Sequence, residues 1–127
     1  MHADGARRND LSGEVNGCAS TVFRALGPGF LEGVYENARA HELRTAGLPV
    51  TQQSGVRVEY KDVVVGEYFV ELLVEDALLV ELKTAKAPEE SHRRQCTNYL
   101  KATGLHLCLL LNFGRPRLEI KRVVHGL

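Results

Sequence analysis

The chain has 127 residues, of which 44% are hydrophobic and 25% are charged. This length suits one domain with one hydrophobic core, and the composition is ordinary for a soluble globular protein. No apolar run is long enough to span a membrane, and the first residues lack the apolar segment of a secretory signal. The formal net charge is zero, whereas nucleic-acid-binding domains usually carry a basic excess, so affinity for DNA would depend on a local basic face or a partner.

We expect residues 1–9 to form a disordered tail and residues 10–127 to form a single domain. The three cysteines are too few and too scattered for a disulfide framework or a zinc site. They are interpreted as small buried hydrophobic residues of a protein from a reducing compartment, which predicts a cytoplasmic location. These cysteines are Cys18, Cys96 and Cys108.

Two amphipathic helices are predicted in the first part of the chain. Apolar residues recur every three or four positions over about residues 10–26, and the Gly-Pro-Gly of residues 27–29 ends this helix. A second helix is expected over about residues 30–46, where Gly47 supplies the usual glycine after a helix.

From residue 50 the apolar period changes to two, which predicts strands over residues 50–60 and 63–74, with Lys61-Asp62 as the turn and Gly66 as a possible bulge. A short apolar strand follows over residues 78–83. Pro88 starts a helix that runs to about Thr103. Residues 107–111 form a strand buried on both faces, and residues 118–123 form an edge strand. The order is α-α-β-β-β-α-β-β, which predicts an α/β fold.

Residues 71–83 carry two carboxylates and one lysine in apolar surroundings, namely Glu71, Glu81 and Lys83. Two carboxylates can hold a divalent cation, and a nearby lysine can orient or deprotonate a water, which is the chemistry of metal-assisted phosphodiester hydrolysis. Glu81 and Lys83 share one face of their strand. A cross-strand ion pair or an exposed strand face would explain the same pattern without a site.

The register of the two strands decides whether the carboxylates meet. A two-residue loop at residues 75–76 would set Glu71 opposite Val80 and place Glu71 and Glu81 on opposite faces. A three-residue connection over residues 75–77, or a bulge, would pair Glu71 with Glu81 on one face. The residues expected to share a strand face with Glu71 are Glu67, Phe69 and Leu73.

Gly29, Glu32 and Tyr35 stand at three-residue steps at the start of the second helix. From the residues alone, a structural interpretation is preferred. Gly29 can cap the helix, Glu32 near the third helical position favours the positive end of the helix dipole, and Tyr35 lies in the core with a hydrated hydroxyl.

The helix after residue 88 places His92, Gln95 and Tyr99 on one side. Gln95 could reach a metal-bound water or a phosphate, although a surface or interface glutamine is more common. His92 is a weak candidate for a metal ligand, because no second histidine lies one turn away. A local basic face could be formed by Arg93, Arg94 and Lys101, with Lys83 and Lys86 just before them.

Taken together, these segments resemble the GxxExxY family, whose motif stands here as Gly29, Glu32 and Tyr35. That family is similar to the PD-(D/E)XK nuclease superfamily. The resemblance covers roughly residues 10–124, with many matching stretches in order. They are Leu26-Gly-Pro-Gly-Phe30, Val65-Gly-Glu-Tyr68, Glu81-Leu-Lys83, Gln95-Cys-Thr-Asn-Tyr-Leu100, Ala102-Thr-Gly-Leu105 and Leu110-Leu-Asn-Phe-Gly114.

The resemblance implies a mixed β-sheet flanked by helices, with an α-β-β-β-α-β core, and a metal-dependent nuclease. The expected partner is nucleic acid, with DNA favoured over RNA as the prediction. The implied catalytic residues are Glu32, Glu71, Glu81, Lys83 and Gln95. The carboxylates of Glu71 and Glu81, with the backbone carbonyl of Leu82, would hold Mg²⁺ or Mn²⁺. Lys83 would position the attacking water and stabilise developing charge.

The family usually has an aspartate where Glu71 stands and a basic residue where Phe69 stands. Glutamate still offers oxygen to a hard cation. Its extra methylene moves the carboxylate by more than ~1 Å, and a displacement of that size can cost about 100-fold in rate. A second hypothesis is therefore a catalytically weak or inactive nuclease-fold domain that binds nucleic acid or a protein partner. A third is an assembly module that forms a homodimer through an edge strand or a helix face.

Overall fold

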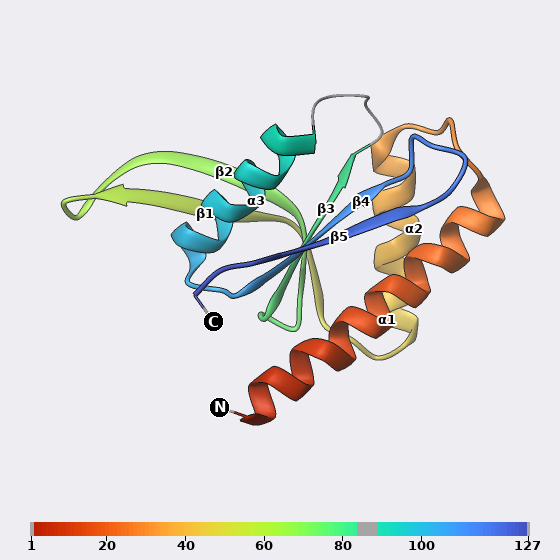
Figure 1. Ribbon diagram of the computed structural model, residues 1–127, viewed down its shortest axis with the longest axis horizontal. Helices are drawn as coiled ribbons and strands as arrows, with labels where there is room; N and C mark the ends of the chain where they lie inside the picture. Colours follow the sequence, from red (N-terminus) through yellow and green to blue (C-terminus); the bar gives the residue numbers. More distant parts are fainter. Residues whose placement is uncertain (1, 84–88, 127) are drawn as a thin grey trace.

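The computed structural model describes residues 2–83 and 89–126, which fold into a five-stranded sheet flanked by helices (Figure 1). The element order is the predicted one, and the mixed α/β fold is confirmed. The elements are α1 (His2–Leu26), α2 (Glu32–Thr45), β1 (Val50–Tyr60), β2 (Val63–Val74), β3 (Leu78–Lys83), α3 (Glu89–Thr103), β4 (Leu107–Asn112) and β5 (Glu119–Val124).

The strands follow one another in the sheet in the order β1-β2-β3-β4-β5. Every neighbouring pair is antiparallel except β3 and β4, which are parallel. A parallel pair needs a long crossover, and α3 lies in that connection. Residues 107–111 of β4 are all buried, as expected for a central strand, and β5 is an edge strand as predicted.

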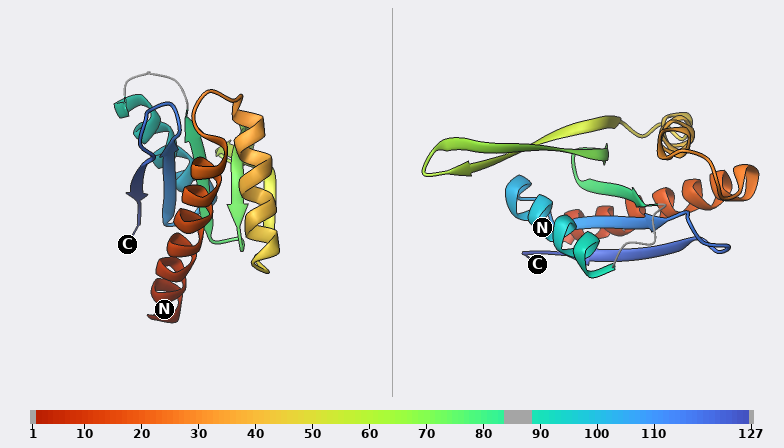
Figure 2. Two further views of the ribbon diagram at one scale, coloured as in Figure 1. Left: turned by 90° about the vertical axis from the view of Figure 1, so that its right-hand side faces the viewer. Right: turned by 90° about the horizontal axis from the view of Figure 1, so that it is seen from above.

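Helices cover both faces of the sheet (Figure 2). Helices α1 and α2 pack on one face through a cluster that includes Leu11, Tyr35 and Leu72. Helix α3 packs on the other through a cluster that includes Leu79 and Leu100. The alternation of strand side chains therefore divides the core into two layers, with the sheet between them.

Strands β1 and β2 continue beyond the sheet as a projecting hairpin, which we name the β-arm and define as residues 55–69 (Figure 1). Its tip is the predicted turn, where Lys61 and Asp62 have φ angles of 51° and 66°, as two-residue hairpin loops require. The register shifts between Val58 and Glu59, opposite the segment that starts at Gly66, so the arm is bulged there. Apolar side chains exposed along the arm are Tyr60, Val63, Val64, Val65, Tyr68 and Phe69.

The expected disordered tail is wrong from His2 onward, because α1 begins there. Within this segment Arg7 donates two hydrogen bonds, of 2.7 and 2.6 Å, to the carboxylate of Glu75 in the β2–β3 connection. Extending an existing helix avoids the cost of nucleating a new one. Once residues 10–26 are helical, adding the residues before them is therefore favourable. Pro88 and Lys86 lie outside the described residues. No helix in the described ranges has the length and apolar character to cross a membrane.

Candidate active site

The β2–β3 connection has the register that the metal-site hypothesis required. Val74 pairs with Leu78, so residues 75–77 form a three-residue connection. Continued along the strands, this pairing brings Glu71 beside Glu81, and the backbone N–H of Glu71 donates to Oε1 of Glu81 at 2.7 Å. Both glutamates are 7% exposed, so two carboxyl groups are buried at adjacent positions on neighbouring strands.

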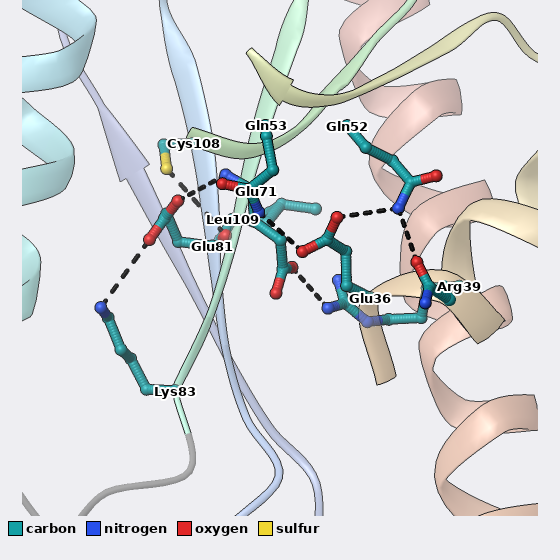
Figure 3. Close-up of polar contacts among 10 residues, drawn as sticks. Glu36, Arg39, Gln52, Gln53, Glu71, Glu81, Lys83, Cys108 and Leu109 are labelled. Atoms are coloured by element: carbon teal, nitrogen blue, oxygen red, sulfur yellow. Dashed lines mark hydrogen bonds and ion pairs between the residues drawn. The ribbon is translucent and has the colours of Figure 1, made fainter. Parts of the chain in front are cut away.

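The two side chains nevertheless turn in different directions (Figure 3). The carboxylate of Glu71 points to α2, where Arg39 donates to it in a buried ion pair, while Glu81 turns toward Lys83. Leu73 packs in the α3 layer, so the expectation that Glu71 and Leu73 share a face is wrong. The alternation breaks opposite Gln53, whose φ of 52° takes it out of the regular ladder. The correct register therefore does not bring the carboxylates together on one face.

Arg39 is the site residue that sequence reasoning missed. Its side chain is 1% exposed, and its guanidinium lies 5.6 Å from the centre of the Phe113 ring. Its Nε and Nη1 atoms are buried without a hydrogen-bond partner in the described structure. Tyr35, Arg39 and Leu43 are spaced by four on the buried stripe of α2. An arginine on such a stripe needs an acidic partner, which was the signal available in the sequence.

Burial sets the protonation behaviour of the carboxylates. Desolvation raises the pKa of Glu71 to about 7, although the Arg39 guanidinium acts to lower it and the charges of Glu81 and Glu36 add to the rise. The pKa of Glu81 is also raised, chiefly by burial, while the backbone N–H of Glu71 and the charge of Lys83 oppose the shift. For both groups the cost of burying the charge thus exceeds the compensation from neighbouring cations and donors.

The carboxylates near this point come from one helix, α2, and from the two strands β2 and β3. Four carboxylates influence one another there, and the two cations among them leave a net charge of −2 when all four are ionised. Carboxylate oxygens and a net negative charge are the donor type and charge that a divalent cation prefers, although the arrangement of the described side chains is not that of a formed site. No group of three potential ligands is close enough to hold one among the described residues. The four carboxylates are those of Glu32, Glu36, Glu71 and Glu81, and the two cations are Arg39 and Lys83.

Lys83 links the carboxylates to a hollow on the α3 side. Its Nζ lies 3.8 Å from Oε2 of Glu81, and its side chain is 23% exposed. Lys83 and Gln95 both line a hollow of about 460 Å³, together with His92. Nε2 of His92 is buried with no hydrogen-bond partner among the described residues, and its pKa is lowered by burial and by the charge of Lys83. A lysine near a buried carboxylate thus faces an open space.

The backbone conformation of the segment before α2 sets the position of Glu32. Gly29 has a φ of 110°, a conformation that favours glycine. Tyr35 is fully buried, and its hydroxyl donates to the carbonyl of Gly27 and accepts from the backbone N–H of Phe30. The structural interpretation of Tyr35 as a core residue is confirmed, although its hydroxyl bonds to the backbone. Glu32 is exposed at the first helical position, not the third, and its charge raises the pKa of Glu81.

The family model of the PD-(D/E)XK nuclease superfamily matches residues 9–123, which is most of the chain. The chain belongs to the PD-(D/E)XK nuclease superfamily. Nucleases of this superfamily are generally dependent on divalent metal ions. The described PD-(D/E)XK fold accordingly carries Glu81, Leu82 and Lys83 at the end of its central strand β3.

Two solved structures share the PD-(D/E)XK fold seen here. The crystal structure of SSO0001 has a TM-score of 0.56 and 12% identity, over 75% of this chain and 50% of that one. An alkaline exonuclease from Laribacter hongkongensis has a TM-score of 0.54 and 17% identity, over 74% of this chain and 56% of the exonuclease. The similarity thus spans about half the length of each neighbour, and at these identities it shows the fold alone. No curated protein matches the chain at a significant level.

Proposed function

We propose that the chain is a metal-dependent nuclease that hydrolyses phosphodiester bonds of nucleic acid. The observation that carries this proposal is the buried carboxylate of Glu81, whose pKa stays raised although it lies 3.8 Å from the lysine two residues later, in a chain of the PD-(D/E)XK nuclease superfamily. A buried acid with a raised pKa next to a cation that faces a hollow is typical of a functional site. The exonuclease neighbour supports the same type of function.

In this proposal Glu81 and the carbonyl of Leu82 hold Mg²⁺ or Mn²⁺, with Glu32 at the exposed side. When bound, the ion polarises the phosphate and lowers the pKa of a water. Lys83 orients the attacking water from the hollow and stabilises the charge that develops on the phosphate. Gln95, which also lines the hollow, contacts the phosphate or that water.

Glu71 contributes only if its carboxylate leaves Arg39 and turns to the side of Glu81. This requirement favours a second candidate function, a catalytically weak or inactive domain that binds nucleic acid or a protein partner. The supporting observation is the buried ion pair itself, which already neutralises Glu71. The variant Glu71→Asp distinguishes these two candidate functions, because the shorter aspartate side chain reaches Arg39 less well. A gain in Mn²⁺ affinity in calorimetry supports a site that has lost metal binding.

We further propose membership of the GxxExxY family, supported by Gly29, Glu32 and Tyr35 at the entrance to α2. DNA is proposed as the substrate rather than RNA. A cytoplasmic location is supported by the free state of Cys18, Cys96 and Cys108. A homodimer or protein partner is supported by the exposed apolar side chains of the β-arm.

The nuclease proposal is tested by incubating the purified protein with linear, circular and single-stranded DNA, and with RNA, in Mg²⁺ or Mn²⁺. We expect metal-dependent cleavage that Lys83→Ala reduces by about 100-fold or more. The matched control is Arg24→Ala, which removes an exposed cation on α1 that does not line the hollow. This variant should cleave DNA at the wild-type rate. Cleavage that persists unchanged in Lys83→Ala would show that the site is wrong.

A further inference from the structure

The hollow beside Lys83 has a lining suited to a nucleotide. It lies between α3 and the β-arm, with a volume of about 460 Å³, in the range of pockets that bury one small ligand. Lys83 and Arg94 supply positive charge, Gln95 and Asn98 supply amides, and no described lining residue is a carboxylate. The hollow thus offers cations and hydrogen-bonding groups to an anionic ligand.

Tyr68 gives this hollow an aromatic wall. Its side chain is 52% exposed, on the part of β2 that runs into the β-arm. Its ring centre lies 5.9 Å from that of the buried Tyr99, and the two ring planes are inclined by 57°, so Tyr99 packs against one side of Tyr68. A half-exposed ring supported on one side, next to cations, is an effective stacking platform for a nucleic-acid base.

We propose that this hollow accepts one unpaired nucleotide of single-stranded DNA, with its base stacked on Tyr68 and its phosphate beside Lys83 and Arg94. The inference rests on the proposed nuclease function, because it specifies which form of nucleic acid that site receives. In an intact duplex the faces of each base are covered by its neighbours, so Tyr68 can stack only on an unpaired or frayed base.

The charged residues that line the two hollows also favour a phosphate site beside Lys83. A second hollow of about 1090 Å³ continues along α3, and there Arg57 and Lys101 are accompanied by Glu59 and Glu67. Phosphate contacts are therefore concentrated at the Lys83 end, and the zero net charge of the chain adds little long-range attraction. Neutralisation of this one phosphate on a single strand predicts that log K falls against log salt with a slope of about −0.7.

The test titrates the whole protein into an oligonucleotide that contains 2-aminopurine, as a single strand and as a blunt duplex, in EDTA so that no cleavage occurs. We expect the single strand to bind at least about tenfold more tightly than the duplex, with a change in 2-aminopurine fluorescence that reports stacking. Tyr68→Leu should weaken single-strand binding by about 5- to 100-fold, whereas Tyr68→Phe should retain it.

Phe69→Leu is the matched control, because Phe69 is 57% exposed beside Tyr68 and does not line the hollow. Equal affinity for the two DNA forms, or an unchanged affinity in Tyr68→Leu, overturns the inference. Cleavage in Mg²⁺ is measured separately. If Tyr68→Leu leaves the cleavage of duplex DNA unchanged, the nuclease proposal stands and the nucleotide site is rejected. If the base stacks on Tyr68 but no DNA is cleaved, the nucleotide site stands and the nuclease proposal is rejected.

Discussion

The residue that most changes the interpretation of the site is Arg39. It supplies a permanent positive charge to Glu71 at the place where a carboxylate ligand was expected. Desolvation makes a buried ion pair a modest contributor to stability, but removing one partner leaves an unpaired buried charge. The ion pair therefore explains how the fold tolerates an acid at this position, and it also withholds that acid from a cation beside Glu81.

Arg39→Met is expected to lower the free energy of unfolding by about 3 kcal/mol at pH 8, because Glu71 is then buried and unpaired. At pH 5 the loss should be smaller, since Glu71 can protonate. The measurement is urea unfolding followed by circular dichroism. The double variant Arg39→Met/Glu71→Leu is the control and should recover most of the wild-type stability. An equal loss in the single and double variants would contradict this role for the pair.

The raised pKa of Glu71 predicts a pH dependence of stability. Glu71 has a pKa of about 7 in the folded chain against 4.5 as its ordinary value. Between these values the folded state holds more protons than the unfolded state, so stability falls as the pH rises from 4.5 to 7. At 1.36 kcal/mol per pKa unit, the fall from this group is about 3 kcal/mol at most.

Glu71→Gln removes that contribution, so the stability difference between wild type and variant should change by up to about 3 kcal/mol between pH 4.5 and pH 7.5. Urea unfolding at a series of pH values measures it. Because the other ionisable groups are the same in both proteins, their contributions largely cancel in the comparison. A difference that is constant with pH would mean that Glu71 is ionised throughout this range.

At the scale of elements, the connection between α1 and α2 shows what a local pattern can predict. The helix ends at residues 26 and 45 agreed with the sequence to within one residue, because glycines mark them locally. The β-arm turn was also predicted, because the polar pair Lys61-Asp62 separates two stretches with the strand period of two. Gly29 and Tyr35 are better explained by the shape of this connection than by chemistry.

Gly29→Ala is expected to lower stability by about 1–3 kcal/mol, because alanine is strained at a φ of 110°. The matched control is Gly33→Ala, which lies inside α2 with no atom within 4 Å of the added methyl group. It should be neutral or should stabilise the helix by up to about 1 kcal/mol. Thermal unfolding of both variants distinguishes them, and equal effects would contradict a special conformation at Gly29.

The candidate site was less predictable than the elements. Glu81 and Lys83 were placed together correctly, because alternation along one strand is a local property. The three-residue connection uses two non-glycine residues with positive φ, Glu75 and Asp76, so its register could not be chosen from turn preferences. The direction of Glu71 depends on Arg39, which is 32 positions away on another element. Only tertiary structure reveals such a partner.

At the scale of the whole molecule, the two core layers share the central strands β3 and β4. The single domain over residues 10–127 stays a prediction, and cooperative unfolding would test it. Leu43→Ala in the α2 layer and Leu100→Ala in the α3 layer should each lower stability by about 2–5 kcal/mol. Tyrosine fluorescence and circular dichroism should give coincident transitions in both variants. Separate transitions would indicate layers that fold independently.

The proposed nuclease activity belongs to the same scale, because it requires residues from α2, β3 and α3 to act together. The most direct measurement is the single-turnover rate of cleavage of labelled single-stranded DNA in Mn²⁺ by wild type and Glu81→Gln. The amide keeps an oxygen for the backbone N–H of Glu71 while removing the charge that a cation needs. Cleavage by the wild type and a rate at least about 100-fold lower in Glu81→Gln are predicted. An unchanged rate in Glu81→Gln, or no cleavage by either protein, would contradict the proposed nuclease site.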